Sequence, residues 1–398
     1  MTASAPRSIL PPLTPAEAVH SGKLAALIRG ELQAAGGWLS FERFMELALY
    51  APGLGYYSAG SVKLGAGGDF VTAPETSELF SRCLARQCAP LLQQTGGEVL
   101  ELGAGTGRMA AGFLTELAAL GALPERYAIL EVSADLVQRQ RARLEQLPAA
   151  LRERVVWLER LPERALNGVI LANEVADALP CRRFVIGSGG VEEVGVALAG
   201  GEAGGGAFRD QLAATDDVLL RACAELGATL PQPLPVGYQS EVCLRITPWI
   251  ATLADTLGRG LLLICDYGLP RRHYYHPQRA RGTLRCHYRQ LAHDDPYLNL
   301  GVQDITAWVD FTRVAEAGIS AGLELAGFAT QTAVLLALGL EELVAAAGDG
   351  IARARLAGEA RRLVLPEEMG ESFKMMAFTR ALDGPLAGFA LQDLRDLL

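Results

Sequence analysis

Residues 97 to 107, Gly-Glu-Val-Leu-Glu-Leu-Gly-Ala-Gly-Thr-Gly, form a short apolar run that leads into three glycines at alternate positions. A helical pattern follows, so the stretch predicts a strand, a tight turn and a helix. Gly103, Gly105 and Gly107 have no Cβ, which allows positive φ and lets a ligand lie against the backbone. The first turn of the next helix has unpaired N–H groups at the same place. We therefore expect this turn to hold a ligand.

Two common glycine motifs do not fit this spacing. A dinucleotide fingerprint reads G-x-G-x-x-G, whereas here the third glycine comes one residue early and Arg108 takes the sixth position. The Lys-Ser/Thr ending of a phosphate-binding P-loop is also missing. The pattern Glu-x-Gly-x-Gly-x-Gly, which starts at Glu101, instead resembles the first motif of the S-adenosylmethionine-dependent methyltransferases. Taken alone, the motif leaves another nucleotide, or a turn that binds nothing, as alternatives.

The neighbouring strand favours a cofactor. A second apolar run, Tyr127 to Leu130, ends on Glu131. In nucleotide-binding α/β folds, a carboxylate at this strand end accepts hydrogen bonds from both ribose hydroxyls. The alternative is a solvated acid at the end of a strand. Both features in one strand–helix–strand unit favour a bound S-adenosyl-L-methionine.

Composition limits the class of protein. Half of the 398 residues are apolar, which is enough for a large core, and the net charge of −9 disfavours a protein that wraps nucleic acid. The seven cysteines contain no C-x-x-C pair, which predicts free thiols in a reducing compartment. Neither a signal-peptide core nor an apolar run of membrane-spanning length is evident, and arginine outnumbers lysine 33 to 3, as in GC-rich bacterial genomes. We expect a cytoplasmic bacterial protein that does not enter a membrane.

Strands alternate with helices after the glycine turn. The third, fourth and fifth strands are expected at 154–158, 168–172 and 260–265, and a closing strand pair at 327–338 and 373–380. Alternation of this kind predicts a parallel sheet with helices on both faces. Ligands of such sheets lie at the carboxyl ends of the strands, so the octapeptide 173–180 after the fourth strand should face the same site as the glycine turn.

The alternation is interrupted twice. The first insertion covers about 181–257; it contains a short antiparallel strand pair, and Ser240 is expected to cap a helix that runs to Leu257. The second covers 269–311 and is expected to be an irregular lid or substrate-contacting segment. Residues 1–95 carry helical patterns and are interpreted as a helical N-terminal cap with an active-site loop, and residues 96–398 as the core domain.

The second insertion contains six arginines between Arg271 and Arg289 and four histidines. His273, His276, Cys286, His287 and His293 are zinc-ligand types, but their spacing matches no known motif and loop positions are expected for all of them, so we predict no metal. The arginines could face RNA. Because an RNP-type aromatic motif is missing and the chain is acidic, nucleic-acid binding is disfavoured.

Carboxylates gather near the predicted site. Glu174 and Asp177 follow the fourth strand, and Glu75 belongs to a polar loop that opens the helix to about Gln94. Clustered carboxylates suit a guanidinium, which presents five donors in a flat fork. The alternative is a helix N-terminus decorated with acids for its dipole. The sequence Asn-Glu-Val-Ala from Asn173 also differs from the Asn-Pro-Pro-Tyr motif of enzymes that methylate exocyclic base nitrogens.

Six motifs together resemble the MidA-like methyltransferases, the relatives of a mitochondrial complex I assembly factor that methylates a protein arginine. The resemblance spans about residues 15–380. In chain order, the motifs are GDFVTAPETS (68–77), ELGAGTG (101–107), ANEVADALP (172–180), CDYG (265–268), GTLRCH (282–287) and DITAWVDFT (304–312).

The resemblance implies a class I methyltransferase fold: an α/β protein with a Rossmann-like sheet of seven strands, a helical N-terminal cap and insertions after strands 4 and 5. It implies S-adenosyl-L-methionine as cofactor, with Thr72, Pro74 and Glu75 closing over its methionine end and Asn173 and Glu174 bordering the methyl group. The remaining cofactor-binding residues implied are Glu101, Gly103, Gly105, Gly107 and Glu131.

The expected activity is methyl transfer to an arginine guanidinium of a protein partner, and a respiratory complex I-type target is implied by the resemblance. The carboxylates orient the guanidinium and accept its proton, with Glu174 as the first candidate and Asp177 or Glu75 as the second. Two alternatives stay open: methylation of a small molecule or RNA by the same core, and a non-catalytic assembly factor that retains cofactor binding.

Overall fold

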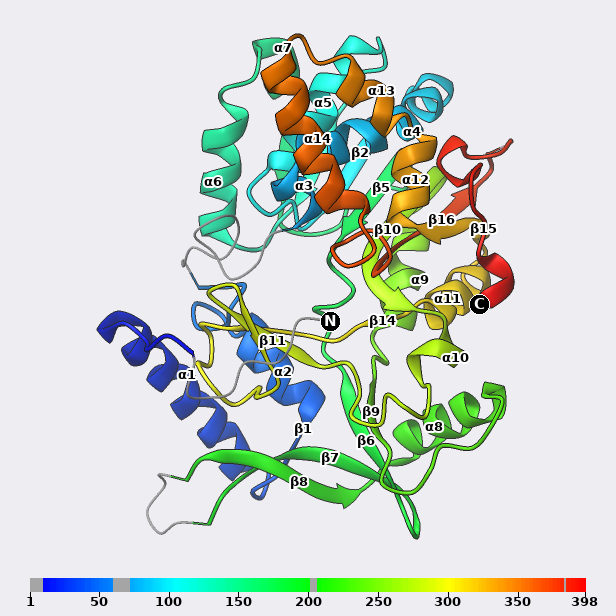
Figure 1. Cartoon of the computed structure of the whole chain (residues 1–398). Helices are drawn as coiled ribbons and strands as arrows, with labels where there is room; N and C mark the ends of the chain where they lie inside the picture. The colour runs from blue at the N-terminus through cyan, green and yellow to red at the C-terminus, as the bar shows by residue number, and fades with distance from the viewer. Residues whose placement is uncertain (1–9, 60–71, 201–205, 383) are drawn as a thin grey trace.

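The computed structural model describes residues 10–59, 72–200, 206–382 and 384–398 (Figure 1). Residues 68–71 of the GDFVTAPETS motif lie outside the described residues. Within the described ranges, no helix is long and apolar enough to cross a membrane. All seven cysteines are free, as predicted.

A twisted mixed sheet forms the core, and its strands are ordered β4-β3-β2-β5-β10-β16-β15. The pairs from β4 to β10 are parallel, and β16 runs antiparallel to both β10 and β15. A two-residue strand, β14 (Val309–Asp310), also pairs with the end of β10. The predicted seven-stranded Rossmann-like α/β fold is thereby confirmed. Its strands are β2 (Glu98–Leu102), β3 (Tyr127–Leu130), β4 (Val155–Leu158), β5 (Leu166–Asn173), β10 (Leu257–Leu269), β15 (Glu324–Thr330) and β16 (Phe373–Arg380).

Helices cover both faces of this sheet. Successive side chains of a strand point to opposite faces, so Val99 and Val169 pack into one hydrophobic cluster and Leu100 and Ile170 into another. The first cluster lies under α4 (Glu78–Thr95), α5 (Arg108–Ala119), α12 (Gln331–Ala337), α13 (Leu340–Ala345) and α14 (Gly350–Val364). The second lies under α9 (Ile246–Thr256) and α11 (Phe311–Ser320). Short elements complete the core: α7 (Ala149–Arg152), η2 (Ala387–Phe389) and η3 (Arg395–Leu397).

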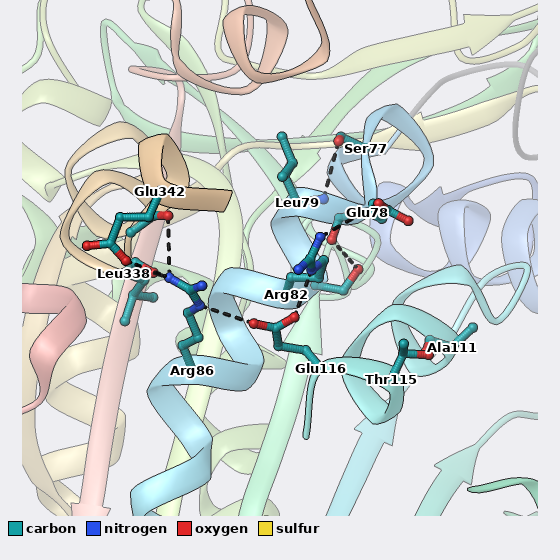
Figure 2. A network of polar contacts seen from close by, with 12 residues as sticks. Ser77, Glu78, Leu79, Arg82, Arg86, Ala111, Thr115, Glu116, Leu338 and Glu342 are labelled. Atoms are coloured by element: carbon teal, nitrogen blue, oxygen red, sulfur yellow. Dashed lines mark hydrogen bonds and ion pairs between the residues drawn. The ribbon is translucent and has the colours of Figure 1, made fainter. Parts of the chain in front are cut away.

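An ion cluster around the buried Glu116 joins the helices that cover the first face of the sheet (Figure 2). Glu116 of α5 accepts from Nε of Arg82 at 2.8 Å and from Nε of Arg86 at 3.1 Å, both on α4. Arg86 also donates to Glu342 of α13 at 3.1 Å. The Glu116 side chain is only 7% exposed, so its two arginine partners are needed to offset the cost of burying its charge.

A second lobe is built from segments far apart in the sequence and occupies the lower half of Figure 1. A hydrophobic cluster joins Phe44 from the N-terminal segment, Val196 and Phe208 from the first insertion, and Cys286 and Ile305 from the second. The elements are α1 (Pro15–Ala34), β1 (Leu39–Ser40), α2 (Phe41–Tyr50), β6 (Arg182–Gly187), β7 (Gly190–Leu198), β8 (Phe208–Ala214), α8 (Asp217–Thr229), β9 (Gln239–Val242), β11 (Arg285–Tyr288), β12 (Leu291–His293) and β13 (Asp304–Thr306).

Three local predictions were wrong. Ser240 lies in β9, opposite Phe184, and caps no helix; α9 begins later, at Ile246, and has Pro248 in its first turn, where proline is tolerated. The 269–311 segment is not irregular: it folds into α10 (Arg271–Tyr274) and the sheet β12-β11-β13. The apolar run expected as a strand over 327–338 changes to helix α12 at Gln331, where Thr330 caps it.

Candidate active site

The turn between β2 and α5 has the predicted conformation. Gly103, Gly105 and Gly107 have φ angles of 61°, 55° and 79°. Gly107 is the N-cap of α5 and offers no side chain, so the first N–H groups of the helix have no side-chain cap. A Cβ at Gly107 would lie 3.2 Å from Cα of Gln140, so close packing also requires glycine there.

Glu131 is buried and already oriented beside this turn. Its Oε1 accepts from the backbone N–H of Ser133 at 2.9 Å, and its Oε2 accepts from Nε2 of Gln140 at 3.1 Å. Gln140 lies on α6 (Ala134–Leu144) and also donates to the Gly105 carbonyl at 3.0 Å. Gln140 is a site residue that was not predicted from the sequence; its signal is a polar side chain four residues from each of the buried Leu136 and Leu144, on the same face of α6. It ties the carboxylate to the glycine turn.

Glu101 directly precedes the turn in the chain, and Glu75 contacts it. Glu101 is buried in β2, where Tyr127 donates to it at 2.7 Å, and burial raises the pKa of Glu101 to about 8. Glu75 lies in α3 (Ala73–Thr76), where its carboxylate accepts from the Thr106 hydroxyl and its carbonyl accepts from Arg108 at 2.9 Å. Glu75 therefore faces the glycine turn. Thr72 and Pro74 flank it on the same short segment.

Glu174 comes directly after β5 in a strained conformation. Its φ is +53°, which a residue with a side chain rarely adopts and which is often found at functional sites. Its backbone N–H donates to the Cys265 carbonyl at 2.8 Å, and its Oε1 accepts from Asn173 Nδ2 at 3.1 Å and from the Ala73 N–H at 3.3 Å. Burial and the nearby Asp177 raise the pKa of Glu174 to about 8.

Asp177 is held by the end of β10. Asp266 accepts from the backbone N–H groups of Ala176 at 2.9 Å and Asp177 at 3.2 Å, which fixes the loop after β5. The Tyr267 hydroxyl donates to Oδ2 of Asp177, whereas Oδ1 is buried and has no partner among the described residues. Burial raises the pKa of Asp177 to about 6 and that of Asp266 well above its usual value. Asp266 and Tyr267 were given no role in the sequence analysis, although an acid in an apolar strand was a signal.

A pocket of about 1090 Å³ opens over these groups. Its lining includes three acids and a tyrosine that contacts one of them, which we call the acid floor: Glu174, Asp177, Tyr267 and Asp304. Asp304 belongs to β13 of the second insertion, and the hydroxyl of Tyr57 from the N-terminal segment donates to both of its carboxylate oxygens, at 3.0 and 3.1 Å. The pocket is thus formed where the two lobes meet. Glu75 is not among its lining residues, so the structure brings Glu174 and Asp177 together and places Glu75 at the turn.

Comparison with known proteins identifies the family. The sequence model of a family described as S-adenosyl-L-methionine-dependent methyltransferase matches residues 83–329. The chain belongs to this family. This chain is similar to a COG1565 superfamily member from Burkholderia thailandensis, whose crystal structure contains bound S-adenosyl-homocysteine. The two are 42% identical with a TM-score of 0.92, and the match covers 98% of this chain and 100% of that chain. A native crystal structure from the same organism is 41% identical with a TM-score of 0.89 and the same coverage.

Curated relatives of the methyltransferase are mitochondrial. Protein arginine methyltransferase NDUFAF7 of Danio rerio is 27% identical, over 86% of this chain and 84% of the relative. The homolog in Drosophila melanogaster is 29% identical, over 75% of this chain and 70% of the relative. The methyltransferase uses S-adenosyl-L-methionine as cofactor, and the residues present fit it: an uncapped helix start, three glycines with positive φ and a buried carboxylate beside them.

Proposed function

We propose that this methyltransferase transfers a methyl group to a guanidinium nitrogen of an arginine in a protein. The observation that carries the proposal is the carboxyl pair Glu174 and Asp177 on the acid floor. Oδ1 of Asp177 is buried without a partner among the described residues, and a buried acceptor of this kind needs a donor. A guanidinium supplies donors in the flat arrangement that carboxylates bind best. The names of the NDUFAF7 relatives support the same acceptor.

We propose that the cofactor lies along the glycine turn. Glu131 lies at the end of β3 beside this turn, where a carboxylate accepts hydrogen bonds from the ribose hydroxyls in nucleotide-binding α/β folds. Asn173 is the last residue of β5, directly before Glu174, and is proposed to border the methyl group. The other residues proposed to surround the cofactor are Thr72, Pro74, Glu101, Gly103, Gly105 and Gly107.

The arginine guanidinium is a poor nucleophile, and the carboxylates of the acid floor would have to orient it and accept its proton. An arginine is protonated, since its pKa lies above 12. Glu174 and Asp177 would hold N–H donors of the guanidinium and so fix the remaining nitrogen in line with the methyl group. The bound cofactor supplies an electrophilic methyl on a sulfonium whose leaving group is a neutral thioether. As the nitrogen gains the methyl it loses a proton, which a carboxylate accepts; Glu174 is the first candidate and Asp177 the second. Glu75, the other second candidate from the sequence, faces the glycine turn and does not line this pocket.

Binding should itself move a proton. At pH 7 Glu174 is mostly protonated in the empty pocket, because its pKa is raised to about 8. A cation within a few ångströms favours the charged carboxylate. We therefore expect an arginine side chain to release a proton from the acid floor when it binds.

A transfer assay tests the proposal. The enzyme is incubated with S-adenosyl-L-methionine that carries a labelled methyl group and with a cell lysate, and the products are resolved into protein, RNA and metabolite fractions. The expected result is label in protein, recovered as methylarginine after hydrolysis. Label on lysine, on a nucleotide or on a metabolite contradicts the proposed acceptor, and cofactor binding with no transfer at all indicates a non-catalytic assembly factor. For location, we propose the cytoplasm, which the seven free cysteines support.

A further inference from the structure

The pocket is lined by groups of opposite charge. Beyond the acid floor, residues of the second insertion line it and supply cations and imidazoles. We call this part the basic wall: His273, His276, Arg279 and Arg281. The loop after α14 adds Glu367 and Glu368 to the lining. A substrate that enters therefore meets both signs of charge.

The arginines of the basic wall differ from their neighbours in pairing. Arg271 is bound to Asp310 and Glu316, and Arg285 to Asp294. Among the described residues, Arg279 and Arg281 have no ion pair. Since Arg285 is neutralised, these two supply the free positive charge among the arginines that line the pocket.

Arg279 is held in place without a carboxylate. Its guanidinium carbon lies 5.1 Å from the ring centroid of Trp308, which also lines the pocket, and its Nε is buried without a hydrogen-bond partner in the described part of the chain. Arg281 is exposed. Burial and the adjacent Arg272 lower the pKa of His273, so this imidazole offers hydrogen bonds and little charge at pH 7. The wall thus has one oriented arginine, Arg279, and one exposed arginine, Arg281, and no described residue pairs with their charges.

We propose that Arg279 and Arg281 bind an acidic side chain of the protein substrate, an aspartate or glutamate within a few residues of the arginine to be methylated. The proposal rests on the proposed function. A pocket of about 1090 Å³ exceeds the ~300–1,000 Å³ typical of small-ligand sites, so one arginine side chain leaves room for flanking residues. Charge-assisted bonds from two arginines to a carboxylate then select the sequence next to the acceptor.

A single carboxylate fits this pocket better than a chain of phosphates. Asp177 and Asp304 on the acid floor, together with Glu367 and Glu368, repel a polyanion such as RNA. An arginine with an acidic neighbour is locally neutral and matches both parts of the pocket at once.

A peptide series tests the proposal. The probes are acetylated nine-residue peptides with one central arginine and alanines elsewhere, in which each position from three before to three after the arginine is replaced by aspartate or lysine. Affinity is measured with S-adenosyl-homocysteine present, and methyl transfer is measured under single-turnover conditions. We expect aspartate at one or two positions to improve binding by about five- to tenfold over alanine, and lysine at those positions to weaken it.

Charge reversal at the wall sharpens the test. Arg281→Glu should reverse the preference, so that the lysine peptide becomes the better ligand, and Arg279→Gln should reduce the aspartate preference. Arg272→Glu is the matched control: Arg272 is exposed on the same segment but does not line the pocket, and the preference should be unchanged. Melting temperatures of the variants confirm that they fold.

The outcomes separate the two proposals. Transfer to arginine peptides with no acidic preference, or a preference that Arg281→Glu leaves unchanged, overturns the role of the basic wall and keeps the proposed function. A twelve-nucleotide RNA is also offered as a competitor. If it displaces the peptides from the wild type but not from Arg281→Glu, the basic wall binds nucleic acid and its proposed role for an acidic side chain is overturned. If no arginine peptide is bound and none is methylated, both proposals are overturned.

Discussion

Glu174 combines three unusual properties in one residue: a φ of +53°, a raised pKa and a place on the pocket lining. Backbone strain in a residue other than glycine costs on the order of 1–3 kcal/mol and persists only where the surroundings enforce it. Here the strand pairing of β5 with β10 enforces it, because the Glu174 N–H donates to the Cys265 carbonyl. The strain aims the carboxyl group at the pocket.

Replacement of Glu174 by glutamine keeps the shape and removes the charge. We expect Glu174→Gln to bind the cofactor normally but to lose methyl transfer by about 10²-fold or more, as for a lost general base. Single-turnover transfer and calorimetric binding of S-adenosyl-homocysteine measure the two effects. Glu163→Gln, an exposed acid far from the pocket lining, is the control. Full transfer by the Glu174 variant would rule out the proposed role.

The same residue makes stability depend on pH. Its pKa is about 8 in the folded protein against an ordinary 4.5, so between these values the unfolded chain binds fewer protons than the folded one. The free energy of unfolding should therefore fall as pH rises from about 4.5 to about 8. Urea titrations across this range should show a smaller fall for Glu174→Gln than for the wild type. If the unfolding free energy falls equally with pH in both proteins, the carboxyl group of Glu174 is solvated and has an ordinary pKa.

The role of the glycine turn in ligand binding can be separated from the effect of backbone strain on stability. Gly105→Ala places a Cβ at φ +55°, and Gly121→Ala does so at φ +64° in a turn where nothing lies within 4 Å of the added atom. Both should lose about 1–2 kcal/mol of stability. Only Gly105→Ala should also lose binding of S-adenosyl-homocysteine, since only that Cβ would meet the proposed ligand. Undiminished affinity of this variant, by calorimetry, would remove the cofactor from the turn.

At the scale of elements, continuous apolar runs could be recognised from the sequence, whereas short alternating patterns could not. Tyr127–Leu130 was predicted at the bounds it has, because a buried parallel strand is a continuous apolar run. In β11, Cys286 and Tyr288 are buried and the residues between and before them are not, an alternation too short to recognise in a segment rich in arginine and histidine. Contacts from α2 and from the strands of the first insertion decide that fold, and these are non-local.

The cluster around Glu116 predicts how firmly α4 and α5 are joined (Figure 2). Glu116→Ala leaves Arg82 and Arg86 without their shared partner, so we expect a loss of about 3 kcal/mol in the free energy of unfolding. Glu342→Ala removes an acid that is 77% exposed and touches the same Arg86, and should cost under about 1 kcal/mol. Chemical denaturation of both variants checks the difference. Similar losses would show that burial of Glu116 is not what matters.

At the scale of the whole molecule, the sequence identified the acids after β5 but not how the acid floor is completed. Asp304 arrives from the second insertion and is held by Tyr57 from the N-terminal segment. These residues are 247 positions apart in the chain, and neither has a local pattern that indicates the other. The same holds for Asp266, whose role appears only when β10 lies beside β5. Residues that act through long-range pairing cannot be found from periodicity.

The Tyr57–Asp304 contact should couple the second lobe to the reaction. Tyr57→Phe removes the hydroxyl that donates to both carboxylate oxygens, while the Ile305 N–H still donates to Oδ1 at 2.9 Å. The loss is that of one hydrogen bond to a charged group, about 1.5–3 kcal/mol. We expect cofactor binding to be unchanged, because the glycine turn lies in the core lobe, and kcat/KM for the arginine acceptor to fall by about tenfold. Tyr297→Phe is the control: its hydroxyl donates to Asp210, which does not line this pocket. If both variants behave alike, or if the loss for Tyr57→Phe is in cofactor affinity, then the second lobe supports the fold and takes no part in holding the acceptor.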